Sequence, residues 1–174
     1  AKAEELGYGL LIKELASFNA NNVSPLLQWF QAHQVDGIIW AVPEIGDNRD
    51  WLTKLLPEIN TPIIFLTMEK RDDISIVSID NFLGAKLAVE HLISLGRKHI
   101  GHIAGPLEWW EARQRKLGWE SALAEAGVTS TQQMWSEGNW SSKSGKNAFA
   151  ELVEKFPEMD GVFVGNDQMA LSVL

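Results

Sequence analysis

At 174 residues, 45% of them hydrophobic and 22% charged, the chain has the composition of a globular protein and can form one large core or two small lobes. Its lack of cysteine excludes disulfides, thiol nucleophiles and thiolate metal sites, and no apolar run approaches the ~20 residues of a membrane span. The formal net charge of −8 argues against binding of a nucleic-acid backbone by this segment, so a role on DNA would require another domain.

Strand and helix signals alternate through the first half of the chain. Residues 1–6 look like the last turns of a helix that ends at Gly7, and the apolar run 8–12 predicts a strand. No helix is expected between 66 and 76, where the charged run 69–73 lies. The other predicted elements are, in chain order, a helix over 24–33, a strand over 37–40, a short helix over 50–56 that stops at Pro57, and strands over 62–66 and 76–79.

The second half continues the alternation with longer helices. Asp80 is placed to cap a helix that runs to Leu95, and Gly96 follows as its stop. The later predicted elements are a strand over 100–104, a helix that ends at Gly127, a strand over 134–138, a helix over 142–156, a strand over 161–164 and a helix from 166 onward. Strands that alternate with helices of this length indicate an α/β fold, with parallel sheets and helices on both faces.

The stretch from His99 to Trp119 carries the strongest functional signal. Its predicted strand breaks at Gly105-Pro106, and Trp109 and Trp110 stand at the start of the following helix. The loop after a strand's carboxyl end is where open α/β sheets bind ligands, and aromatic faces with a guanidinium suit a hydroxyl-rich molecule. Arg115 lies near this loop, so both a ligand contact and a surface salt bridge remain open. Arg113 lies on another face of the helix and is expected at the surface.

Six further residues follow predicted strands or precede helices. Trp140 can pack as a hydrophobic staple on the next helix or cover the pocket as a lid. In the pair Asn166-Asp167, one member is expected to cap the last helix while the other faces the crevice, and Asp80-Asn81 repeats that arrangement. Thr67 ends a buried strand, where its hydroxyl can reach the crevice or satisfy the backbone.

Signs of an enzyme are weak. His99 and His102 are three residues apart on a strand, so they face opposite sides and cannot share a metal ion. Nucleophile-elbow, Walker and dinucleotide-binding motifs are absent from the sequence. We therefore predict no catalytic residue, no metal and no cofactor.

Several segments together resemble one family. They are VDGIIWAVP, TPIIFL, SIDNFLGAKLAVEHLISLGRKHIGHIAGP, ARQRKLGWESAL and VGNDQMAL. In this order they are similar to the effector-binding domain of the lac/galactose repressor family of bacterial transcription regulators, over nearly the whole chain. The resemblance implies a fold like that of a periplasmic binding protein, in which a small ligand lies between two Rossmann-like lobes with parallel sheets flanked by helices. We place the N-terminal lobe at residues 1–95 and the C-terminal lobe at 96–174.

The resemblance also implies a ligand-binding site. The arginine of the family's R-x-x-G motif, which contacts the ligand, matches Arg115, the aromatic residue before the S-x-x-S-G helix matches Trp140, and the asparagine of NDQMAL matches Asn166. Thr67 stands where relatives commonly have an aspartate that binds sugar hydroxyls. Trp109 and Trp110 occupy a loop of small polar residues in relatives, which indicates a more apolar ligand or a more crowded pocket. With Asp80, these residues form the predicted site.

The family pattern further implies a longer protein, of which this chain would be a piece cut at both ends, without the helix-turn-helix and hinge that precede such domains. The implied function is to bind a small, sugar-like effector and to control operator binding allosterically, as a cytoplasmic homodimer that contacts DNA through that missing domain. The alternative is an extracytoplasmic sugar-binding protein of a transporter, and an enzyme on a Rossmann-like fold is a third reading.

Overall fold

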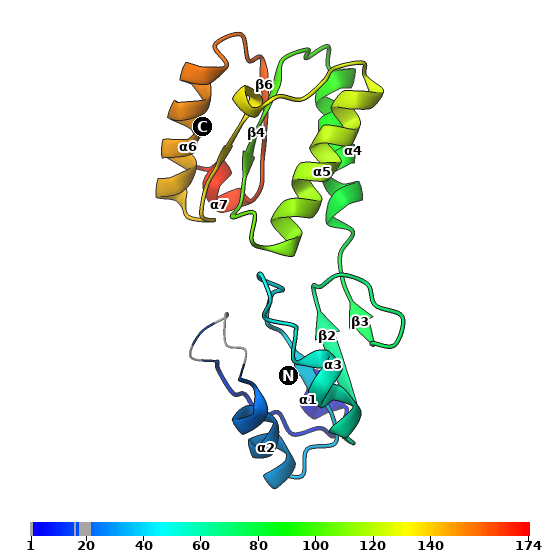
Figure 1. Cartoon of the computed structure of the whole chain (residues 1–174). Helices are drawn as coiled ribbons and strands as arrows, with labels where there is room; N and C mark the ends of the chain where they lie inside the picture. The colour runs from blue at the N-terminus through cyan, green and yellow to red at the C-terminus, as the bar shows by residue number, and fades with distance from the viewer. Residues whose placement is uncertain (1, 16, 18–21) are drawn as a thin grey trace.

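The computed structural model describes residues 2–15, 17 and 22–174, and it contains two parallel three-stranded sheets (Figure 1). The first sheet has the order β1-β2-β3, and the second has the order β5-β4-β6 with β4 at its centre. The strands are β1 (Ile38–Trp40), β2 (Ile63–Leu66), β3 (Ile76–Val77), β4 (Ile100–Ala104), β5 (Trp135–Glu137) and β6 (Gly161–Val164). Every ladder is parallel, which confirms the predicted α/β class.

The first lobe, residues 2–79, is built around the sheet β1-β2-β3. Its helices are α1 (Lys2–Glu5), α2 (Ser24–Ala32) and α3 (Leu52–Leu55), the last followed by a 3-10 turn, Leu56–Glu58. Pro25 lies in the first turn of α2, where the missing N–H costs no hydrogen bond. Side chains from α2, α3 and one face of the sheet form a single core, whose buried members are Val23, Leu27, Ile38, Trp40, Trp51, Leu52, Ile63, Phe65 and Met68.

The prediction of a strand over residues 8–12 is wrong for this structure. These residues pair with no strand, and Tyr8 and Ile12 are 61% and 81% exposed. An apolar run becomes a strand only when a neighbouring edge supplies hydrogen bonds to it, and no described strand lies beside this run. The sheet face opposite the core is likewise open, because Ile39, Ile64 and Val77 remain exposed on it.

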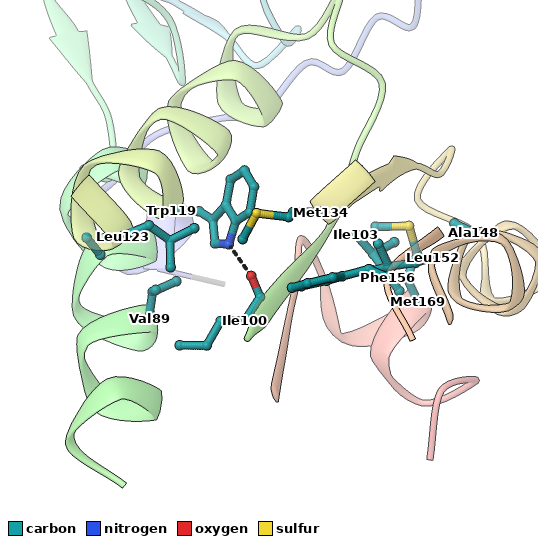
Figure 2. Close-up of a cluster of buried hydrophobic side chains, with 11 residues drawn as sticks. Val89, Ile100, Ile103, Trp119, Leu123, Met134, Ala148, Leu152, Phe156 and Met169 are labelled. Atoms are coloured by element: carbon teal, nitrogen blue, oxygen red, sulfur yellow. Dashed lines mark hydrogen bonds between the residues drawn. The ribbon is translucent and has the colours of Figure 1, made fainter. Parts of the chain in front are cut away.

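The second lobe, residues 80–174, is built around the sheet β5-β4-β6. Its helices are α4 (Asn81–Ser94), α5 (Trp110–Glu125), α6 (Ser142–Lys155) and α7 (Asp167–Ala170), with a 3-10 turn at Gln132–Met134. In Figure 1, α4 and α5 lie together on one side of this sheet and α6 lies on the other. Figure 2 shows the core between them, in which the Trp119 indole N–H donates to the Ile100 carbonyl at 3.1 Å.

Helix α4 belongs to the second lobe by its packing, which corrects the lobe boundary expected after residue 95. Its Val89 is fully buried in the second core, beside Trp119 and Leu123. Helices α4 and α5 approach so closely that a Cβ on Gly118 would lie 2.3 Å from the Phe82 carbonyl oxygen. The chain therefore passes from the first lobe to the second just before α4, whereas the boundary expected from the sequence lies at the end of this helix.

The ends of α4 and α5 follow the local signals of the sequence. The Asp80 carboxylate accepts a hydrogen bond from the Leu83 N–H at 2.8 Å, which caps α4 as predicted. Gly96 and Gly127 follow the two helices with φ of +84° and +79°, the left-handed conformation that favours glycine. Within the part of the chain that the structure describes, no helix is both long and apolar enough to span a membrane.

Candidate functional site

The loops that follow β1 and β4 meet between the lobes. The Gly46 N–H donates to the Glu108 carbonyl at 3.0 Å, and the Trp110 N–H donates to the Glu44 carbonyl at 3.0 Å. These two bonds form a short antiparallel bridge between Ile45 and Trp109. The carboxyl ends of strands from both sheets are thereby brought to one place, where α/β folds bind their ligands.

Arg115 is held in a fixed orientation near this place. Its Nε donates to the Asn81 side-chain oxygen at 2.9 Å, and its Nη1 donates to the Gly165 carbonyl. The guanidinium carbon lies 5.5 Å from the centroid of the Trp140 ring. No carboxylate of the described residues lies within 4.0 Å of it, so the surface salt bridge left open by the sequence is not formed. Burial lowers the pKa of Arg115, an effect that the nearby Glu111 and Asp167 oppose.

Trp140 covers the start of the loop after β4. A Cβ on Gly105 would lie 2.0 Å from the Trp140 ring, so only glycine leaves room for the indole there. The ring meets Trp109 edge-on, with centroids 5.8 Å apart, and the backbone of Trp140 has φ of +71°, which is strained for a side chain of this size. Its indole N–H is buried without a hydrogen-bond partner among the described residues. Such strain and an unsatisfied donor are typical of ligand sites.

Both polar atoms of the Asn166 side-chain amide form hydrogen bonds. Its oxygen accepts from the Met169 N–H at 2.9 Å and caps α7, while its nitrogen donates to the Trp140 carbonyl at 3.0 Å. Asn166 is therefore the capping member of its pair, and it also fixes the backbone of Trp140. Asp167 lines the same cavity as Arg115, and its carboxylate opposes the lowering of the pKa of Arg115.

Two adjacent cavities lie at these loops and share Ile79, Asp80 and Asn81. The smaller, of about 370 Å³, lies beside the crossover between the lobes, and Arg115, Gly165, Asn166 and Asp167 are among its lining residues. The larger, of about 610 Å³, lies between the lobes and is lined by residues of both, including Met68, Arg71, Trp110 and Gln114. Both volumes are in the range of small-molecule sites.

The structure brings six of the seven predicted site residues to this region. Asp80, Arg115 and Asn166 line the smaller cavity, Asp80 and Trp110 line the larger, and Trp109 and Trp140 contact each other beside Arg115. Thr67 lines neither cavity. It follows β2 with φ of +54°, and its backbone N–H donates to the Val77 carbonyl at 3.1 Å.

Three charged residues at the lobe junction are buried, and the sequence analysis did not identify them as part of the site. Glu44 and Arg49 lie in the loop after β1 and are 5% and 2% exposed, and Glu111 in the first turn of α5 is 8% exposed. In sequence they look like the solvated charges of surface turns. The only available signal is that each follows a strand at its carboxyl end, the same position that singled out Trp109 and Asp80.

The two carboxylates among these residues are partnered differently. Glu44 binds Arg71 at 2.6 Å and accepts from the Glu69 N–H at 2.7 Å, so both of its oxygens are used. Glu111 has one oxygen buried without a partner among the described residues, and burial raises the pKa of its carboxyl.

Arg49 lies against the first core. Its Nη2 donates to the Val42 carbonyl, its Nη1 lies 3.4 Å from the Asn48 side-chain oxygen, and its guanidinium carbon is 6.0 Å from the ring centroids of Trp40 and Phe65. Its Nε is buried without a partner in the described part of the chain. Burial lowers the pKa of Arg49 to about 10.

Residues 2–174 match the family described as periplasmic binding proteins and sugar binding domain of the LacI family. The chain belongs to this family. The Escherichia coli K12 lactose operon repressor is 27% identical over all 174 residues, which cover 47% of that repressor. The regulator CelR of Thermobifida fusca is 32% identical over 149 residues, or 84% of this chain and 43% of CelR. These relatives are transcription regulators rather than enzymes, and the chain spans about half the length of the curated relatives it matches.

Solved structures of the family share the fold. The complex of CelR with cellobiose has a TM-score of 0.81 at 27% identity and covers 97% of this chain and 51% of that one. The lactose repressor bound to the anti-inducer ONPF in its induced state also has a TM-score of 0.81, at 28% identity, with 98% and 62% covered. The resemblance and the fold like that of a periplasmic binding protein, both predicted from sequence, are therefore confirmed.

Proposed function

We propose that this chain is the effector-binding domain of a bacterial transcription regulator and that it binds a small, sugar-like molecule between its two lobes. The observation that carries the proposal is the pair of cavities at the strand ends, beside which Arg115 is fixed by Asn81 and Gly165 and faces Trp140. Aromatic rings next to a fixed guanidinium match the apolar faces and hydroxyl edges of a carbohydrate. The relatives named above favour a regulator over a transporter component.

The proposed mechanism follows from the position of these groups. An effector that contacts the second lobe through Arg115 and Trp140 and the first lobe through the loop after β1 would favour one relative orientation of the lobes. A ligand shifts such an equilibrium only by its difference in affinity for the two states, and a coupling of about 1–3 kcal/mol is typical of allosteric proteins. In this proposal Asn166 positions Trp140, and Asp80 fixes the start of α4 at the crossover.

The remaining features belong to the regulator that would contain this domain. We propose that it acts in the cytoplasm as a homodimer and contacts operator DNA through a separate helix-turn-helix domain. A separate DNA-binding domain agrees with the net charge of −8 on this effector-binding chain, because that charge disfavours contact with the phosphates of DNA. Effector binding would then change operator affinity through the orientation of the lobes.

The test is a titration of the chain with monosaccharides and disaccharides, cellobiose included, followed by tryptophan fluorescence. Trp109 and Trp140 lie beside Arg115, so a bound ligand should change the emission. Arg115→Ala should weaken binding at least about tenfold, the effect of losing charge-assisted hydrogen bonds, whereas the exposed Arg97→Gln should bind as the unaltered chain does. Equal affinity in Arg115→Ala would remove this residue from the site. A ligand that leaves the operator affinity of the whole regulator unchanged would overturn the allosteric part.

A further inference from the structure

Ile45 is a buried apolar residue that belongs to neither hydrophobic core. Its side chain is 4% exposed, yet among the described residues neither core cluster includes it. In the bridge between the lobes it stands opposite Trp109, and the two backbone hydrogen bonds flank this pair. In an antiparallel ribbon, a pair of this kind brings its two side chains closer together than a hydrogen-bonded pair does. The junction therefore contains an apolar contact as well as two backbone bonds.

The loop that carries Ile45 is held in shape by bonds within the first lobe. The Asn48 side-chain oxygen accepts from the Ile45 N–H at 3.1 Å, and the Asn48 side-chain nitrogen donates to the Pro43 carbonyl at 2.9 Å. The Glu44 carboxylate ties the same loop to Arg71, which follows β2. None of these bonds involves the second lobe, so the loop can keep its conformation when the lobes separate.

The opposite loop is held in the same way by the second lobe. The Arg113 guanidinium donates to the Leu107 carbonyl at 3.0 Å and to the Glu108 carbonyl at 2.9 Å. The Glu137 carboxylate, at the end of β5, accepts from the Leu107 N–H at 3.1 Å. The bridge thus joins two loops that are each formed within their own lobe. Such a contact can open and close without refolding either loop.

We propose that Ile45 and Trp109 form a latch that holds the two lobes together before any effector binds. Opening the latch breaks two backbone hydrogen bonds and exposes the Ile45 side chain to water, and the hydrophobic effect opposes that exposure. Trp109 also meets the Trp140 ring edge-on, with centroids 5.8 Å apart, so the latch is continuous with the candidate site. In a regulator of the proposed kind, an effector therefore enters when the latch is open and changes how often it closes. That last step rests on the proposed function, whereas the latch itself does not.

The experiment measures the distance between the lobes without ligand, by double electron–electron resonance on the 174-residue chain. The chain has no cysteine, so Gln28→Cys on α2 and Lys146→Cys on α6, both at exposed positions, place one spin label on each lobe and nowhere else. We expect a single narrow distribution of distances. Ile45→Ser in the first lobe and Trp109→Ser in the second should each broaden and shift it. The exposed Ile39→Ser on β1 is the matched control and should leave it unchanged.

A broad distribution in the labelled chain would overturn the latch, and so would a narrow one that survives both serine substitutions. Ile45 and Trp109 belong to neither core among the described residues, so circular dichroism should show intact helices in both variants. Broadening with intact helices then reports separation of the lobes and not unfolding.

A cross-link provides a second test that does not depend on the serine variants. The Cα atoms of such a pair lie about 4.5 Å apart, within the range of about 4.4–6.8 Å that a disulfide spans. The double variant Ile45→Cys/Trp109→Cys should therefore form a disulfide on oxidation, whereas Ile39→Cys/Trp109→Cys should stay reduced. Equal oxidation of the two, or none in the first, would contradict the latch. Neither test contains a ligand, so both outcomes are independent of whether the chain binds a sugar.

Discussion

Burial sets the protonation of His102, a side chain in the middle of the second core. The ring is fully buried, stacks on Phe163 at 4.9 Å and 13°, and donates from Nδ1 to the Phe163 carbonyl at 2.9 Å. Its Nε2 has no partner among the described residues, so a second proton would be buried without an acceptor. Burial accordingly lowers the pKa of His102 to about 4.

The lowered pKa of His102 predicts a loss of stability in acid. The unfolded chain takes up a proton near pH 6.5 and the folded one only near pH 4, so the free energy of unfolding should fall as the pH drops between these values. The loss from this residue is at most about 3 kcal/mol. His102→Gln keeps an N–H donor for the Phe163 carbonyl and cannot titrate, so its urea-unfolding midpoint should depend less on pH. Equal slopes for the two chains would contradict the prediction.

Glu111 predicts the opposite dependence on pH. Burial raises the pKa of its carboxyl, so the folded chain holds this proton more tightly than the unfolded chain, and the free energy of unfolding should fall as the pH rises above about 4.5. Glu111→Gln removes the ionisation and should be more stable at pH 8 by about 1 kcal/mol, the cost of an unsatisfied buried group. The gain should vanish near pH 4 in thermal unfolding. The exposed Glu108→Gln is the control, and a gain that is constant over pH would contradict the assignment.

At the scale of the elements, α4 and α5 of the second lobe pack closely against each other. This packing depends on Gly118, because a Cβ there would meet the Phe82 carbonyl at 2.3 Å and the Ala85 Cβ at 2.9 Å. Gly84 of α4 provides a contrast, since a Cβ at that position would meet nothing within 4 Å. The same substitution therefore tests packing at one site and helix propensity at the other.

We predict effects of opposite sign for alanine at these two glycines. Gly118→Ala should lower the free energy of unfolding by about 1–3 kcal/mol, because the two helices must move apart. Gly84→Ala should raise it by up to about 1 kcal/mol, since alanine favours the helix and nothing obstructs its methyl group. Urea unfolding followed by circular dichroism measures both. Stabilisation by Gly118→Ala would show that the helices can separate without cost.

At the scale of the whole molecule, two separate cores are joined by one chain crossing and by the bridge between Ile45 and Trp109. The second core has a helix on each side of its sheet, whereas the first leaves Ile39, Ile64 and Val77 exposed. The two lobes therefore differ in the apolar area that they bury, which is the main source of stability.

This separation predicts that damage to one core stays in its own lobe. Phe65→Ala in the first core and Leu152→Ala in the second should each cost about 2–5 kcal/mol, because both side chains are fully buried. Hydrogen exchange read by mass spectrometry should speed up over residues 22–79 in the first variant and over 80–174 in the second. Loss of protection in both lobes from either change would show that the chain unfolds as one cooperative unit.

Much of the site was within reach of sequence reasoning. Position after a strand, together with the family motifs, pointed to Arg115, Trp140 and Asn166, and the structure brings these three together. The remaining features of this region could not be predicted from the sequence. Arg49 and Glu111 become buried because loops from different lobes meet, and Thr67 lines neither cavity. These outcomes depend on contacts between segments far apart in the chain.

The sequence by itself determined the order of helices and strands from 24 onward, the cap at Asp80 and the stop at Gly96, because these follow from side-chain periodicity and from bonds within a few residues. Only the tertiary structure decided that α4 packs on the second lobe and that residues 8–12 stay outside the sheet. It alone also decided that charges after β1 lie buried beside α5. Each of these outcomes depends on which segment, distant in the chain, is available to bury a side chain or to form hydrogen bonds with a strand's backbone. The local sequence does not determine this.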